Sequence, residues 1–358
     1  MKKRISYISS IFLIVLFVGV FQSCDRDCPT CPDDNPPEPG NYRLYVINEW
    51  YNTLISIDTP ADTVIDSISL DYESFGLYLT PDGNRLLVGN GDAQEMEVYS
   101  AADLSHIETI DQYGDYYFDK TDNIGIYYAG LMEKIYFIDP YTLVPFDSIS
   151  RGIFGGSLDT ATNLFIANKS VSTNIIYFID CDSRALTDSI DLGLYAWDLA
   201  YSWATNEIYF HGSPGLGSAF FAYDLNLDSI TLAIGTINST GSIAISPDGS
   251  QVYMNDGGDG MHFEYPRGDI WVIGTGSHEL VELIPPFIFP SGESISLPTF
   301  GDIILSPDDT RAYIAANGTT NGYQPIAVVD LSAGKIINGI LNDENFWAKD
   351  IVLGPVPD

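Results

Sequence analysis

Short apolar segments alternate with turn-forming residues along most of this chain, and one such pattern recurs at three places. Residues 79–90 read LTPDGNRLLVGN, residues 245–256 read ISPDGSQVYMND, and residues 305–316 read LSPDDTRAYIAA. Each combines an alternating apolar stretch, a Pro-Asp turn and a second stretch rich in β-forming side chains. Proline presets φ, Asp hydrogen-bonds its own backbone and Gly adopts positive φ, so each segment predicts a β-hairpin.

The hairpins recur at a nearly regular interval. Successive second strands end 42, 40, 38, 44, 44 and 60 residues apart, at Val46, Val88, Tyr128, Ile166, Phe210, Met254 and Ile314. Six intervals mark seven units, and the sixth unit carries a long insertion. A period of about 40 residues with four short strands is typical of a β-propeller.

The units share an internal order, and the two chain ends complement each other. A third strand ends in Asp in most units, as in ISIDT (55–59) and IYFID (135–139 and 176–180), and a fourth strand follows a turn.

The first unit begins at Asn41 with its second strand, whereas the chain ends in DIVLGPVPD, an innermost strand without a unit. We therefore expect Ile351–Leu353 to pair with the first unit and close the ring, which removes free strand edges.

This order resembles the YVTN-type propeller repeats. In that family a unit reads approximately as a strand, Ser-Pro-Asp-Gly, VYVAN, a strand ending in VID and a TI strand, and here ISPDGSQVYMND and LFIAN (164–168) with IYFID are similar to it. The resemblance spans about residues 42–358. It implies an all-β, seven-bladed propeller, but it says little about function, because such propellers serve as binding, scaffold and occasionally enzymatic domains.

Composition and charge narrow the function. The chain has 358 residues, 45% of them hydrophobic, with 32 glycines, 20 prolines and a net charge of −34. Binding of nucleic acid needs clustered Lys and Arg, so we expect no nucleic-acid partner. The acidic residues are dispersed, which favours a solvated surface, and the alternative is affinity for cationic ligands.

The first residues have the layout of an export signal. MKKRISYISSIFLIVLFVGVFQSC combines a basic start, an apolar run and Ser23-Cys24. It resembles a bacterial lipoprotein signal, which implies a signal peptide at 1–23, a membrane anchor through lipid on Cys24, and a place in the cell envelope. That place is the outer membrane, the cell surface or the periplasmic face. The alternative is an uncleaved anchor, because Ile5–Phe21 is just long enough to span a bilayer.

A Pro-rich tether follows at residues 24–40, ahead of the propeller at 41–358. Within the tether, Cys28 and Cys31 form a C-x-x-C among prolines. No further metal ligands lie nearby, so a local disulfide or simple thiols are favoured over a zinc or redox site.

A ligand is expected at the mouth of the central channel. In a propeller, the loops before the innermost strands share a face with the loops between second and third strands. Aromatic side chains beside carboxylates in these loops suit sugars, cationic groups or a large flat ligand, although they also suit packing between blades. The candidate ligand-binding residues are Trp50, Tyr72, Tyr113, Tyr195, Trp197, Asp198, His211, Asp302 and Trp347.

The insertion of the sixth unit offers a weaker metal candidate. Its first part, NDGGDGMHFEYPRGD (255–269), holds Asp256, Asp259 and Asp269, whose oxygens are the ligand type that calcium prefers. The strict alternating calcium-loop signature is absent, so a plain loop is the alternative.

The sequence favours binding over catalysis. It contains no H-E-x-x-H, no nucleophile elbow and no Gly-rich phosphate loop. The leading hypothesis is a lipid-anchored propeller that binds a small molecule, glycan or protein, for nutrient capture or as a surface scaffold. The alternative is a metal-dependent hydrolase or lactonase that uses mouth carboxylates such as Glu49, Asp198 and Asp302.

Overall fold

Every residue that the computed structural model describes lies in one compact unit, which spans residues 37–358. The described residues are 42–118, 124–129, 134–153, 155–159, 162–169, 174–213, 219–235, 242–255, 269–285, 287–288, 294–295, 302–315, 326–340, 346 and 348–357. Within these ranges, no helix has the length and apolar character needed to cross a membrane.

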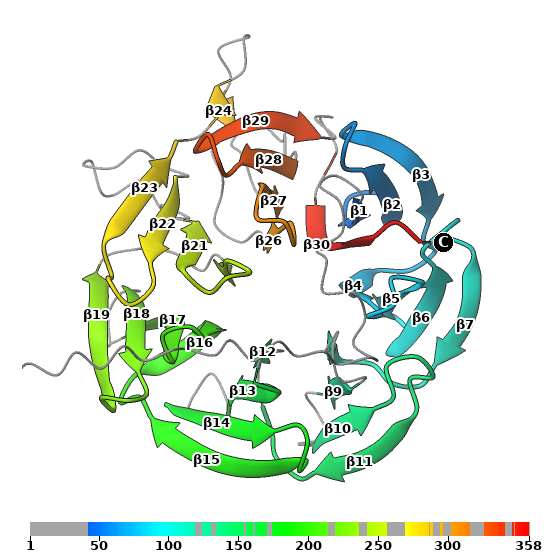
Figure 1. The fold of residues 1–358 in the computed structure, drawn as a ribbon. Coiled ribbons are helices and arrows are strands. Elements are labelled where there is room, and N and C mark those ends of the chain that lie inside the picture. Colours follow the sequence, from blue (N-terminus) through cyan, green and yellow to red (C-terminus); the bar gives the residue numbers. More distant parts are fainter. Residues whose placement is uncertain are drawn as a thin grey trace, which may run out of the picture. The chain divides into compact units, whose positions relative to one another are not determined.

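The described strands form seven four-stranded antiparallel sheets, which follow one another around a central axis as the blades of a β-propeller (Figure 1). The predicted all-β, seven-bladed fold is therefore confirmed. From the axis outward, the first three blades are β30 (Ala348–Pro355), β1 (Tyr42–Asn48), β2 (Thr53–Asp58), β3 (Thr63–Ser69); β4 (Ser74–Leu79), β5 (Arg85–Asn90), β6 (Glu95–Ser100), β7 (His106–Ile110); and β8 (Asp115–Phe118), β9 (Gly125–Ala129), β10 (Lys134–Ile138), β11 (Pro145–Ile149).

The remaining four blades repeat this order from the axis to the rim of the ring. They are β12 (Gly155–Asp159), β13 (Leu164–Asn168), β14 (Ile175–Asp180), β15 (Ala185–Asp191); β16 (Tyr195–Ser202), β17 (Glu207–Ser213), β18 (Ala219–Asp224), β19 (Ser229–Gly235); β20 (Ile243–Ile245), β21 (Gln251–Asn255), β22 (Ile270–Gly274), β23 (Leu280–Ile284); and β26 (Ile303–Leu305), β27 (Arg311–Ala315), β28 (Ile326–Asp330), β29 (Lys335–Ile340).

The three segments with a Pro-Asp turn are the hairpins β4–β5, β20–β21 and β26–β27, as predicted. In the first, the Asp82 carboxylate accepts hydrogen bonds from the Thr80 hydroxyl at 2.6 Å and from the Asn84 backbone N–H at 3.1 Å. Gly83 has a φ of 72°, which a residue with a Cβ rarely adopts. The Pro-Asp-Gly sequence thus specifies the turn through its own local hydrogen bonds.

The two ends of the described chain share the first blade. β30 is antiparallel to β1, with Ile351 opposite Val46 and Leu353 opposite Leu44. This confirms the predicted pairing of the final strand with the first unit, and it places the C-terminal strand between blades 7 and 2 at the axis (Figure 1).

The core lies between the blades, because each blade packs both faces of its middle strands on its neighbours. β5 and β22 are buried along nearly their whole length, whereas the outermost strand β3 is largely exposed. One apolar cluster joins Val46 and Ile55 of blade 1 to Tyr313 and Ala315 of blade 7. This two-sided burial explains why the middle strands read as continuous apolar runs rather than alternating ones.

The insertion of the sixth unit contributes one short hairpin, β24 (Phe287–Ile288) with β25 (Ser294–Ile295). Most of its remainder, including residues 256–268, lies outside the described residues.

Candidate functional site

Four of the seven inner strands carry an aspartate where the strand begins. Asp115 and Asp198 lie in β8 and β16, Asp302 directly precedes β26, and Asp350 lies in β30. In each of these blades, the residue that follows the aspartate is paired with the second strand of the same blade. The four aspartates therefore occupy equivalent positions near the start of their inner strands. Inner strands begin on the face where second strands end, which we call the mouth face. The four carboxyl groups therefore lie around the channel at one level.

Two of these aspartates join neighbouring blades. The backbone N–H of Leu77 in β4 donates to Asp350 Oδ2 at 2.7 Å, and the backbone N–H of Ile243 in β20 donates to Asp198 Oδ2 at 3.0 Å. In both cases the donor belongs to the inner strand of the next blade. The carboxyl group thus satisfies a backbone donor on an inner strand edge that has no strand neighbour.

Asp302 and Asp350 form a carboxyl pair between blades 7 and 1. The two carboxyl groups lie close enough that ionisation of one opposes ionisation of the other. Burial raises the pKa of both carboxyl groups, and repulsion by Asp302 raises that of Asp350 further.

Two tyrosines of the inner strands β4 and β8 add to this polar layer. The Tyr78 hydroxyl donates to Asp115 at 2.9 Å, and burial raises the pKa of that carboxyl group. The Tyr117 hydroxyl accepts from the backbone N–H of Gly156 at 3.1 Å. Burial, with the charges of Asp115 and Asp198, raises the pKa of Tyr117, so its hydroxyl stays protonated and can donate to a ligand.

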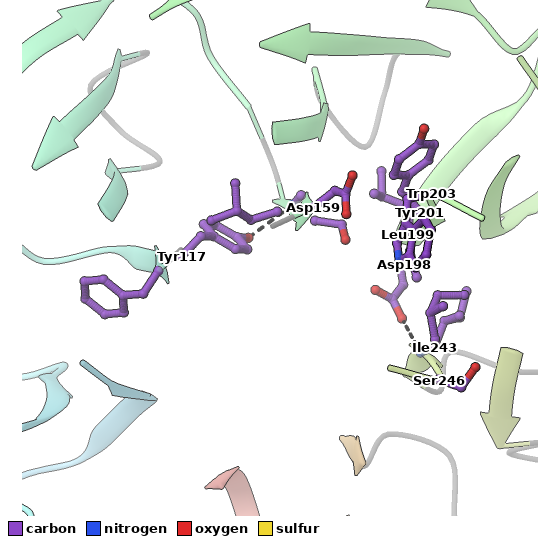
Figure 2. A pocket seen from close by; sticks show the side chains of 14 residues that line it. Tyr117, Asp159, Asp198, Leu199, Tyr201, Trp203, Ile243 and Ser246 are labelled. Atoms are coloured by element: carbon purple, nitrogen blue, oxygen red, sulfur yellow. Dashed lines mark hydrogen bonds between the residues drawn. The ribbon is translucent and has the colours of Figure 1, made fainter. Parts of the chain in front are cut away.

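A cavity of about 520 Å³ lies against the inner strands β8, β12, β16 and β20. Figure 2 shows Asp198 and Tyr117 among its lining side chains. Burial raises the pKa of Asp198 to about 7, and the charge of Asp302 contributes to this rise. The polar and aromatic lining residues are Tyr117, Phe118, Ser157, Asp159, Asp198, Tyr201, Trp203 and Ser246.

A second feature of the mouth face is a set of exposed aromatic side chains around an ion pair, which we call the rim cluster: Glu49, Trp50, Tyr51, Phe75 and Lys349. Lys349 Nζ lies 2.9 Å from Glu49 Oε1 and 3.9 Å from the centre of the Phe75 ring. Trp50 is 62% exposed, Tyr51 53% and Phe75 41%. Such large exposed rings are the residues that ligand and partner surfaces use most.

The structure places most of the predicted ligand-binding residues on the mouth side, in different environments. Trp50 and Tyr195 are exposed. Tyr72 is partly buried and its hydroxyl lies 3.1 Å from that of Tyr99. Tyr113 is partly buried, and its carbonyl accepts from the Tyr127 hydroxyl at 2.9 Å.

The other predicted residues divide into buried, channel-lining and undescribed positions. His211 is fully buried in β17, edge-on to Phe220, so an exposed ligand at the mouth does not reach its ring. Asp198 and Asp302 lie at the channel, as described above. Trp197 is in the backbone of β16, but its side chain lies outside the described residues, as does the whole of Trp347.

The metal and lipid candidates are tested only in part. Asp269 is buried directly before β22, whereas Asp256, Asp259 and Cys24 lie outside the described residues. Among the residues that are described, no three His, Cys, Asp or Glu side chains are grouped so that they could hold a metal ion.

The sequence did not point to Lys349, to Tyr117 or to the other residues that line the cavity apart from Asp198. The aspartate of β8 is followed by Tyr116 and Tyr117, and strand alternation sends the second of these to the face opposite the first. That alternation is the signal that points to Tyr117. Nothing in the local sequence pairs Lys349 with Glu49, because their contact depends on the closure of the ring.

No family model matches the chain, and no curated protein matches its sequence. Solved structures do resemble it. A protein of unknown function from Desulfotomaculum acetoxidans DSM 771 superposes with a TM-score of 0.62 at 16% identity, covering 88% of this chain and 99% of that one. The Kuenenia stuttgartiensis hydrazine synthase gives 0.55 at 12%, covering 74% and 79%.

A third similar structure is the dihydro-heme d1 dehydrogenase NirN in complex with DHE, with a TM-score of 0.59 at 12% identity, covering 92% of this chain and 78% of that one. At such low identity these likenesses show the fold and nothing about ligand or reaction. What the comparisons establish is that this chain has the fold of a β-propeller.

Proposed function

We propose that this protein is a non-catalytic binding protein of the bacterial cell envelope, and that it holds a glycan on the mouth face at the rim cluster. The observation that carries the proposal is the exposure of Trp50 and Tyr51 beside the Lys349–Glu49 ion pair. The flat, apolar face of a sugar ring stacks on such aromatic rings, while its hydroxyl groups suit the neighbouring charged side chains.

The arrangement of Lys349 supports a preorganised surface. Its ammonium group is held between the Glu49 carboxylate and the Phe75 ring. The Phe75 ring in turn lies against Gly91, where an added Cβ would come within 2.3 Å of the ring. The charged part of the surface and the Phe75 ring would therefore need little reordering when a ligand binds, which lowers the entropic cost of binding.

The N-terminal sequence supports a surface location for this binding protein. Lipid on Cys24 and the tether at residues 24–40 would hold the propeller at a distance from the membrane.

We expect mass spectrometry of the mature protein to find a lipid-modified N-terminal Cys24. Cys24→Ser should remove the lipid, and because the apolar residues 5–21 then stay attached, the readout is the mass of the N-terminal peptide and not release from the membrane. A mature protein that carries no lipid on Cys24 would contradict this anchor.

The binding proposal is tested on a glycan array and by calorimetry with the best array hit. We expect Trp50→Ala with Tyr51→Ala to weaken binding at least tenfold, a loss of about 1.4 kcal/mol. Tyr141→Ala is the matched control, because Tyr141 is 38% exposed but lies in the β10–β11 turn, on the opposite face. An array without a hit, or equal binding by both variants, would refute a glycan site at the rim cluster.

A further inference from the structure

We infer that the cavity along β8, β12, β16 and β20 binds an organic cation, with the Asp198 carboxylate as its counter-charge. This site is separate from the rim cluster, and the inference does not depend on the glycan proposal.

The charges that line the cavity are all of one sign. Asp159 and Asp198 contribute carboxyl groups from β12 and β16, and none of the described lining residues is a lysine, arginine or histidine. Burial penalises the ionised form of a carboxyl group, and the lining of the cavity supplies no cationic side chain to offset this penalty. A cationic ligand would supply the missing charge.

The remaining lining groups suit an organic ammonium group. Tyr117, Tyr201 and Trp203 bring aromatic rings to the cavity, and cations are attracted to the faces of such rings. The Tyr201 hydroxyl is already held by Asn206 at 2.8 Å, which fixes that ring. A volume of about 520 Å³ also falls within the usual range of small-molecule sites, roughly 300–1,000 Å³.

The surroundings strengthen the preference for positive charge. Asp115, Asp302 and Asp350 surround the channel at the level of Asp198, and the whole chain carries a net charge of −34. A cleft lined by one sign of charge concentrates the field and attracts counter-ions. A bare metal ion fits less well, because among the described residues no three ligating side chains converge here.

Binding at this site is expected to depend on pH through Asp198. The titratable side chains around it are Tyr117 of β8, Asp159 of β12, which lines the same cavity, His211 opposite it in β17, and Asp302 before β26; β20 contributes only the Ile243 backbone N–H. Since burial raises the pKa of Asp198 to about 7, the group is protonated at mildly acidic pH. A cation that requires the ionised carboxylate must then displace a proton.

Calorimetry with benzylamine, which is cationic throughout, and benzyl alcohol, its neutral counterpart, tests the inference. We expect benzylamine to bind at about pH 8.5, and about 30-fold more weakly at about pH 5.5, where about 3% of Asp198 is ionised. Benzyl alcohol should not bind. Near neutral pH, benzylamine should displace a proton from Asp198. Titrations in two buffers of different ionisation enthalpy should then give different binding enthalpies, a readout that needs no variant.

Two aspartate variants sharpen the test. Asp198→Asn keeps an oxygen that can accept from the Ile243 N–H but loses the charge, so benzylamine binding should be lost. Asp302→Asn, at the equivalent position outside the lining, should keep binding and shift its pH midpoint downward, because Asp302 raises the pKa of Asp198. The inference would be overturned if benzylamine did not bind at millimolar concentration or if benzyl alcohol bound equally well. It would also be overturned if the affinity for benzylamine did not depend on pH, or if Asp198→Asn bound benzylamine as well as the intact protein does.

Discussion

The aspartates that begin the inner strands have two opposing effects on stability. Asp198 and Asp350 each accept a backbone hydrogen bond from the next blade, which contributes about 1 kcal/mol per bond to the free energy of unfolding. Their burial also penalises the ionised form, as the raised pKa values show. The backbone hydrogen bonds favour the ionised carboxylate, but burial outweighs them, so the folded protein is more stable when these groups are protonated.

Because burial raises the pKa of these carboxyl groups, we predict that the free energy of unfolding depends on pH. Replacing one of the carboxyl groups with an amide should reduce this dependence. A carboxyl group whose pKa is raised by folding binds more protons in the folded chain, so the free energy of unfolding falls as pH rises above the ordinary aspartate pKa of about 4. The fall ends at the raised pKa. Asp302→Asn removes the repulsion within the Asp302–Asp350 pair, so we expect it to stabilise the protein at mildly alkaline pH by about 1 kcal/mol, roughly the equivalent of one pKa unit.

Urea unfolding at about pH 4 and about pH 8 measures this effect. At the lower pH Asp302→Asn and the intact protein should be almost equally stable, because Asp350, and Asp302 where it is present, are then largely protonated. A destabilisation of the same size at both pH values would show instead that the Asp302 side chain is needed for packing and that charge repulsion is unimportant.

At the scale of strands and turns, the sequence predicted more than it did at the scale of single side chains. The repeat of about 40 residues and the Pro-Asp turns are local signals, so the hairpins β4–β5, β20–β21 and β26–β27 could be read directly. The site residues depend on which blades become neighbours. The contact of Lys349 with Glu49 joins positions 300 residues apart, and no periodicity encodes such a pair.

The turn at Gly83 gives a prediction at this scale. Its φ is 72°, and an added Cβ would lie 2.7 Å from Cγ of Pro355 in β30, so Gly83→Ala would both strain the backbone and push on the closing strand. We expect a loss of about 2 kcal/mol in the free energy of unfolding, of which about 1 kcal/mol is backbone strain.

Gly193→Ala is the matched control for this turn. Gly193 has nearly the same φ, 71°, but an added Cβ would meet no atom within 4 Å, so only the strain of about 1 kcal/mol should appear. Equal losses in the two variants, measured by chemical denaturation, would mean that the contact between Gly83 and Pro355 does not matter.

For the whole molecule, the mismatch between the chain ends was the informative signal. A first unit without its inner strand and a final inner strand without a unit could be matched from the sequence alone, and the Val46–Ile351 and Leu44–Leu353 pairs bear this out. The cavity could not be predicted, because its wall is assembled from four blades and its volume depends on how side chains from each of them pack. Repeats predict a ring well, but the differences between repeats decide what the ring contains.

Closure leads to the prediction that tests the architecture most directly. Removing residues 351–358 deletes the partners of Val46 and Leu44, exposes the inner edge of β1, and uncovers the apolar cluster that Ile351 shares with blade 7. Residues 356–358 lie beyond β30, so a chain that lacks only these three provides the matched control. We expect the shorter deletion to melt like the intact protein and the longer one to lose its cooperative thermal transition, because an open ring leaves both a free strand edge and unburied apolar surface. Far-ultraviolet circular dichroism during heating measures both. If the chain without residues 351–358 unfolded cooperatively at the temperature of the intact protein, the ring would not depend on the pairing of its two ends.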